Sequence, residues 1–104
     1  MKNMFFGLLM FFATGVAHAY TAKGSQGCGV YVADFDKDGW EKIANGAWLV
    51  GVITGYNYSR KSDVGKGIDI KSIELYVYNY CKKYPLSDTA EAAEVLIYSL
   101  KQDS

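Results

Sequence analysis

Apolar residues recur every three or four positions over much of the chain, which is the spacing of one face of an α-helix. The longest such stretch runs from about residue 39 to residue 58. Its predicted apolar face consists of Trp40, Ile43, Ala44, Ala47, Trp48, Val52 and Tyr56. This pattern predicts one long amphipathic helix in the middle of the chain.

Two further stretches with the same spacing follow. In the first, Asp69 stands at the N-cap position and Pro85 ends the helix. Its apolar stripe is formed by Ile70, Ile73, Val77, Tyr80, Cys81 and Tyr84. In the second, we expect Ser87 to cap the helix, and Asp88 and Glu91 lie near its positive end. Its apolar face consists of Ala93, Leu96, Ile97 and Leu100.

The remaining segments are less regular. Residues 28–35 fit a short helix or a strand, because the central valines and tyrosine favour β-structure in a run too short to decide. Residues 60–67 are charged and contain two glycines, which predicts a loop, and the small polar residues of 20–27 predict a flexible lead. We therefore expect an all-α fold, a small single-domain bundle of three to four helices over residues 28–104.

Three glycines, Gly46, Gly51 and Gly55, interrupt the long helix, and each costs about 1 kcal/mol relative to alanine. Gly51 and Gly55 are four positions apart and therefore lie on one face. We expect them to let another helix pack closely beside Trp48 and Tyr56. A groove for a partner protein is the alternative.

The first nineteen residues have the order of a secretory signal peptide. A charged start at residues 1–3 precedes an apolar run over 4–12, and the small-residue site Ala17-His18-Ala19 follows. A membrane span needs about 20 apolar residues, and this run is shorter, so cleavage after Ala19 is preferred over a retained anchor. The sequence thus predicts a cleaved signal peptide over 1–19, a periplasmic or secreted location, and no stable membrane insertion after cleavage.

The two cysteines, Cys28 and Cys81, are expected to form a structural disulfide, because they lack C-x-x-C spacing and an exported chain meets an oxidising compartment. Two free thiols or a redox pair are the alternatives. A bridge that closes a loop of about fifty residues stabilises by roughly 4 kcal/mol in the chain-entropy model. A domain this small would depend on it.

Cleavage would also remove His18, the only histidine. Without histidine or free thiols the chain lacks the usual nucleophile–base pairs and soft metal ligands, so we expect no enzyme activity and no cofactor. A carboxylate pair or a Ser–Lys pair could still act, but no spacing singles one out. Eleven acidic and eleven basic side chains give no basic surface for nucleic acid.

One segment resembles a metal-binding loop. Asp34, Asp36, Asp38 and Gly39 match the first half of an EF-hand, in which alternate carboxylates converge on one Ca²⁺. The second half does not match, because Asn45 stands where a bidentate glutamate is expected. We prefer an acidic turn whose Asp38 caps the long helix, with these aspartates as weak metal candidates and a calcium-binding module as an alternative.

Tyrosine is unusually frequent, with nine residues in the chain. Because Phe35 is the one phenylalanine that cleavage would leave, tyrosines must build part of the core. Tyrosine and tryptophan are also enriched at binding surfaces, since they combine an apolar body with a polar tip. We expect a minority to contact a partner protein, and the candidates are Trp48, Tyr56, Tyr76, Tyr78, Tyr80 and Tyr84.

This arrangement of cysteines and helices resembles small exported proteins of the HdeA type. The resemblance covers most of residues 28–101 and is carried by Cys28, the stretch WLVGVITGYN at 48–57, Asp69, the stretch YCKKYP at 80–85, and Ala92-Ala93 ahead of Leu96. Members of that family are compact helical periplasmic proteins with one disulfide between the first and third helical segments. The resemblance therefore implies the same HdeA-like architecture for this chain.

The function that the resemblance implies is that of an acid-stress chaperone, which loosens at low pH and holds unfolded clients through exposed apolar surface. Protonation of the carboxylates would leave this chain strongly positive, and self-repulsion would loosen it. A homodimer is a further expectation.

Periplasmic immunity proteins that neutralise type VI secretion effectors share the same features, since they are helical, contain disulfides and carry signal peptides. Such a protein would bind a single toxin tightly at neutral pH, whereas a chaperone would bind many clients, mainly in acid. The sequence therefore predicts an exported, non-enzymatic protein that acts through protein–protein contact. Both kinds of partner, and both functions, stay open at this point.

Overall fold

The computed structural model describes residues 20–102, and in this range the chain folds into four α-helices. They are α2 (Cys28–Lys37), α3 (Trp40–Arg60), α4 (Ile70–Lys83) and α5 (Thr89–Gln102). The described range contains no strand, although Gly27 and Asp88 form an isolated antiparallel bridge. Residues 28–35, for which helix and strand were both open, lie in α2. The all-α prediction is therefore confirmed, whereas the predicted signal peptide lies outside the described residues.

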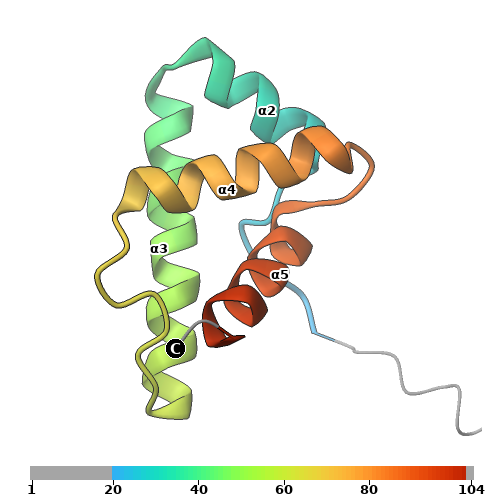
Figure 1. Cartoon of the computed structure of the whole chain (residues 1–104). Coiled ribbons are helices and arrows are strands. Elements are labelled where there is room, and N and C mark those ends of the chain that lie inside the picture. The colour runs from blue at the N-terminus through green and yellow to red at the C-terminus, as the bar shows by residue number, and fades with distance from the viewer. Residues whose placement is uncertain (1–19, 103–104) are drawn as a thin grey trace, which may run out of the picture.

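The central element of the fold is α4, which packs against the three other helices and lies across α3 (Figure 1). Its buried residues, Ile73, Val77 and Cys81, are spaced by four and so form one face. Tyr31 reaches this face from α2, and its buried hydroxyl donates a hydrogen bond of 2.9 Å to the carbonyl oxygen of Glu74. Burial raises the pKa of Tyr31, so the hydroxyl stays a donor.

The hydrophobic core combines this face of α4 with residues from every other helix. Apart from those already named, its buried members are Cys28, Leu49, Ile53, Val64, Ala92, Ala93, Leu96 and Ile97. Val64 comes from the predicted loop between α3 and α4, and the Asn57 side chain fixes it by accepting a hydrogen bond of 2.9 Å from its backbone N–H. The loop therefore contributes to the core although it contains no regular structure.

Three helix caps were predicted, of which one is confirmed. Asp69 accepts a hydrogen bond of 2.7 Å from the backbone N–H of Ser72 at the start of α4, as predicted. The predicted cap at Ser87 is wrong: Asp88 accepts a hydrogen bond of 2.8 Å from the backbone N–H of Glu91, and Ser87 donates to the Glu91 side chain. Asp88 directly precedes the first residue of α5, so its carboxylate reaches the first turn.

The predicted cap at Asp38 is also wrong. Asp38 ends α2 in a left-handed conformation, with φ of 60°, and its backbone N–H donates to the carbonyl oxygen of Asp34. Gly39 then precedes α3 without any side-chain cap. Because only these two residues separate the helices, Asp38 closes the first one and its carboxylate turns to Lys42, whose Nζ lies 3.3 Å away.

The apolar face predicted for α3 is not the most buried face of this helix. The buried residues of this helix are Asn45, Gly46, Leu49 and Ile53. Three residues of the predicted face border the core, namely Trp48, Val52 and Tyr56. The others lie outside it, and Trp40 and Ile43 are 71% and 73% exposed. α3 carries more than one apolar stripe, and periodicity alone does not show which of them meets the other helices.

The close helix packing expected at Gly51 and Gly55 is also wrong. A methyl group added to either glycine would meet nothing within 4 Å. The close approach is at Gly46, where an added methyl group would collide with the side-chain carboxylate of Glu74 on α4. An alanine at this position would displace the Glu74 side chain, so the close approach lies five positions before Gly51, where it was expected.

Candidate protein-binding surfaces

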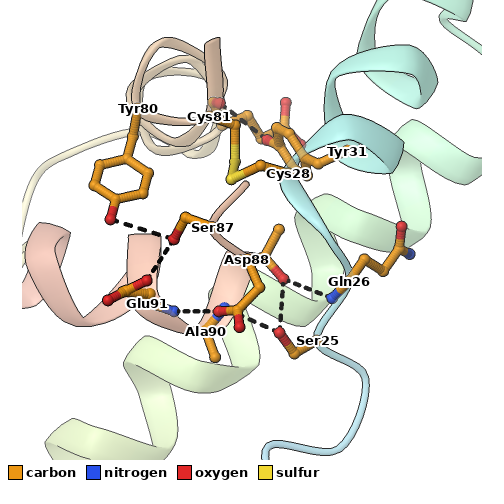
Figure 2. Close-up of a disulfide and its surroundings, with 12 residues drawn as sticks. Ser25, Gln26, Cys28, Tyr31, Tyr80, Cys81, Ser87, Asp88, Ala90 and Glu91 are labelled. Atoms are coloured by element: carbon orange, nitrogen blue, oxygen red, sulfur yellow. Dashed lines mark hydrogen bonds between the residues drawn. A yellow bond between two sulfur atoms is a disulfide. The ribbon is translucent and has the colours of Figure 1, made fainter. Parts of the chain in front are cut away.

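A disulfide joins Cys28, the first residue of α2, to Cys81 near the end of α4, with the two Cα atoms 4.8 Å apart (Figure 2). This confirms the predicted pairing. Both cysteines are fully buried, and no free cysteine is present in the described part of the chain. The bond fixes the beginning of α2 against the C-terminal end of α4, so these two helices cannot separate at that point.

The lead before α2, expected from its composition to be flexible, is hydrogen-bonded to the start of α5 (Figure 2). The backbone N–H of Gln26 donates to the Thr89 hydroxyl at 2.9 Å, and the backbone N–H of Thr89 donates to the Gln26 carbonyl at 2.8 Å. The Ser25 hydroxyl accepts a further hydrogen bond, of 3.1 Å, from Ala90. Small polar residues serve here as hydrogen-bond partners, a role that composition does not reveal.

Three of the six candidate partner-binding residues line one hollow between α4 and α5. Tyr76, Tyr80 and Tyr84 follow one another at intervals of four, and the ring centroids of Tyr80 and Tyr84 are 4.9 Å apart. The hollow has a volume of about 540 Å³ and is completed by Asn79, Lys83 and Val95. We call it the tyrosine hollow. Tyr84, at 47% exposed, is its most accessible aromatic residue.

The other three candidates lie elsewhere and contact the chain itself. The Trp48 indole N–H donates a hydrogen bond of 2.7 Å to the carbonyl oxygen of Lys23, which attaches the lead to α3. Tyr56 borders the core on the same helix. Tyr78 stacks on Phe35 of α2 with ring centroids 4.1 Å apart. The structure therefore brings together half of the predicted aromatic set and separates the rest.

The aspartates of the calcium-loop hypothesis do not converge. Asp34 accepts a hydrogen bond of 3.0 Å from the Asn45 side chain, and Asp36 accepts one of 2.8 Å from the Tyr78 hydroxyl. Asp38 pairs with a lysine of α3. Asp34 and Asp36 belong to a helix rather than to a loop, so their side chains diverge. No group of three or more His, Cys, Asp or Glu side chains within the described residues is placed to hold a metal ion.

A second surface was not predicted from the sequence. It is a groove of about 600 Å³ between α3 and the first turns of α4. Its apolar walls are formed by Ile43, Ala47, Val50 and Ile70, and Glu74 lines it from α4. We call it the isoleucine groove, since Ile43 and Ile70 are 73% and 51% exposed. The spacing of Ile43, Ala47 and Val50 by four and three residues is the signal that could have identified it.

Comparisons of the chain with protein-family models, with curated proteins and with solved structures gave no match. The HdeA-like resemblance therefore stays a hypothesis that rests on the residues quoted for it. None of the helices within residues 20–102 is long and apolar enough to cross a membrane.

Proposed function

We propose that this chain is an exported, non-enzymatic protein that binds other proteins as an acid-stress chaperone of the HdeA-like type. The observation that carries the proposal is the way α2 is held. A covalent bond that acid leaves intact attaches its first residue, whereas carboxylates attach its C-terminal half. The two kinds of attachment respond differently to pH.

The carboxylate attachments connect α2 to both neighbouring helices. Asp34 accepts its hydrogen bond from Asn45 of α3, and Asp36 accepts its hydrogen bond from Tyr78 of α4. Hydrogen bonds to ionised groups contribute about 1.5–3 kcal/mol, and less where solvent reaches them. Hydrogen bonds of this kind owe their strength to the charge of the carboxylate. Their loss in the proposed acid state would weaken the attachment of the C-terminal half of α2, while the Cys28–Cys81 bond would keep its first residue in place.

Loosening of α2 would uncover aromatic surface. Phe35 lies between Tyr78, on which it stacks, and Tyr31, whose ring centroid is 6.3 Å from its own. Such a surface suits unfolded clients, which bind through their own apolar segments. The net positive charge that the chain acquires in acid adds repulsion between its elements. A disulfide-tethered but loosened protein is therefore the proposed client-binding state.

The test measures aggregation of an acid-sensitive enzyme with and without the oxidised protein, at about pH 3 and pH 7. We expect suppression of light scattering in acid only. The double variant Asp34→Asn, Asp36→Asn mimics the protonated carboxyls and should suppress aggregation at a higher pH. Asp63→Asn, which removes a loop carboxylate, is the matched control and should behave as the wild type. Absence of client protection in acid would reject the chaperone proposal.

A single toxin is the alternative partner, and the tyrosine hollow favours it. The hollow exists without any loosening of the fold, and its aromatic walls suit one complementary partner at neutral pH. Affinity capture from periplasmic extract at neutral and acid pH separates the two functions. One stoichiometric partner at pH 7 would replace the chaperone by an immunity protein, and broad capture restricted to acid would exclude the immunity function. The calcium-binding alternative finds no support in the diverging aspartates.

A further inference from the structure

The isoleucine groove contains a carboxylate that forms no salt bridge with any described residue. Glu74 extends from α4 over the α3 backbone at Gly46, where a methyl group would collide with it. The Glu74 side chain forms no hydrogen bond and no salt bridge within the described residues, whose two salt bridges are Lys37–Glu41 and Lys42–Asp38. A half-buried carboxylate thus lies among apolar walls without a cationic partner.

The two lysines that line the groove do not supply that partner. Lys42 is bound to Asp38 at 3.3 Å, and its ammonium group lies 4.0 Å from the centre of the Phe35 ring. Lys71 is exposed and forms no salt bridge with Glu74, although it lies only three positions before it on α4. Lys42 is therefore engaged with Asp38, and Lys71, although it lines the groove, is not bound to Glu74, so the Glu74 carboxylate is available to a basic residue of a partner.

The chemistry of an occupant follows from this combination. A purely apolar segment would bury the Glu74 carboxylate without a partner, which costs free energy. An acidic segment or an anionic headgroup would be repelled by it. A lysine or arginine flanked by apolar residues matches both features, since its stem packs on apolar walls while its cationic end meets the carboxylate.

We propose that the isoleucine groove binds a segment of a partner protein in which a basic residue, flanked by apolar side chains, pairs with Glu74. This inference rests on the proposed protein-binding function, and it does not require chaperone activity in acid. The flanking apolar residues of the segment would contact Ile43 and Ile70, the exposed large apolar residues of the groove walls. Gly46 leaves the space that the carboxylate occupies.

The experiment is a nuclear magnetic resonance titration of the oxidised protein at neutral pH with three helical peptides. They share leucines four positions before and after a central residue, which is arginine, norleucine or glutamate. We expect saturable shifts at the amides of Gly46, Ala47 and Ile70 with the arginine peptide. Its affinity should exceed that of the norleucine peptide by about tenfold, the factor expected for one charge-assisted hydrogen bond.

Two variants test whether Glu74 causes the preference for the arginine peptide. Glu74→Gln keeps the shape of the side chain and should abolish the preference for the arginine peptide, while Asp63→Asn removes a distant charge and should retain it. An unaltered preference in Glu74→Gln, equal binding of the glutamate peptide, or shifts confined to other surfaces would overturn the proposal. Circular dichroism melting verifies that each variant is folded. Client protection in acid is measured separately, so failure of one proposal can be told from failure of the other.

Discussion

The hydroxyl group of Tyr78 on α4 donates a hydrogen bond of 2.8 Å to the carboxylate of Asp36 on α2. The same tyrosine ring stacks on Phe35, so one side chain provides both a polar and an aromatic contact between the two helices. Cys28 and Cys81 join these helices at the other end of α2. The pair Asp36 and Tyr78 is therefore the place where a change in charge acts on the packing of α2 without affecting its covalent attachment.

Tyr78→Phe should lower the free energy of unfolding by about 1 kcal/mol at neutral pH, because it removes the hydrogen bond but keeps the stacked ring. Urea unfolding at about pH 7 measures the loss. Asp36→Asn in a double-mutant cycle isolates the pair. Additive losses in the two single variants would show that this hydrogen bond contributes nothing to stability.

Replacing both Cys28 and Cys81 by alanine should lower the free energy of unfolding by roughly 4 kcal/mol, since the bond closes a long loop. Domains have only about 5–15 kcal/mol in total, so the variant should be close to unfolding at 37 °C. The measurement is a urea titration of the oxidised wild type against the double variant. Equal transition midpoints would contradict a structural role for the disulfide.

Asp69→Ala should destabilise the fold at neutral pH and much less in acid. The hydrogen bonds from Ser72 lower the pKa of the Asp69 carboxyl, so the ionised form stabilises the start of α4. A lowered pKa gives a contribution that is complete above about pH 4 and is lost as the pH falls through the lowered pKa. Melting temperatures of wild type and variant should therefore converge below that pH. The control is Asp63→Ala, because that residue caps no helix.

The features predicted correctly depend on residues that are close in sequence. The cap at Asp69 follows from its position before an apolar periodic run, and the helices follow from that periodicity. The pairing of Cys28 with Cys81 is correct for a different reason: with two cysteines there is only one possible intramolecular pair. None of these predictions required knowledge of how the helices pack.

The features missed depend on how the helices pack. α3 carries apolar residues on several sides, and only its packing against the other helices determines that Leu49 is buried while Ile43 is exposed. Glu74 is one charged residue among many in the sequence. It acquires its special surroundings only because that crossing places it in the isoleucine groove. The groove therefore could not be assembled from periodicity alone.

Gly51→Ala and Gly55→Ala should each raise the free energy of unfolding by about 0.5–1 kcal/mol. Both glycines lie inside α3, and an added methyl group meets nothing within 4 Å. Alanine then restricts the unfolded chain and favours the helix without any steric penalty. Gly46→Ala is the informative contrast, because its methyl group would displace Glu74. Chemical denaturation of the three variants should give gains at positions 51 and 55 and no gain at position 46.

Gly24→Ala should release the lead from α3. Gly24 has φ of 89°, a left-handed conformation that disfavours alanine, and an added methyl group would collide with the indole of Trp48. Displacing that indole breaks its hydrogen bond to the carbonyl oxygen of Lys23, which lies one residue before Gly24. The two effects together should cost about 2 kcal/mol, and tryptophan emission should shift because Trp48 becomes more exposed.

Gly27→Ala is the matched control for this release. Gly27 has φ of −63°, and a methyl group added there meets nothing within 4 Å. Because Gly27 is the N-cap of α2, where glycine is preferred to alanine, the substitution should cost about 0.5–1 kcal/mol without displacing Trp48. Amide hydrogen exchange at Ser25 and Gln26 reports the attachment of the lead directly, and it should accelerate in Gly24→Ala but not in Gly27→Ala. Equal exchange in the two variants would mean that the contact between Trp48 and Lys23 does not hold the lead, and that the hydrogen bonds to α5 suffice.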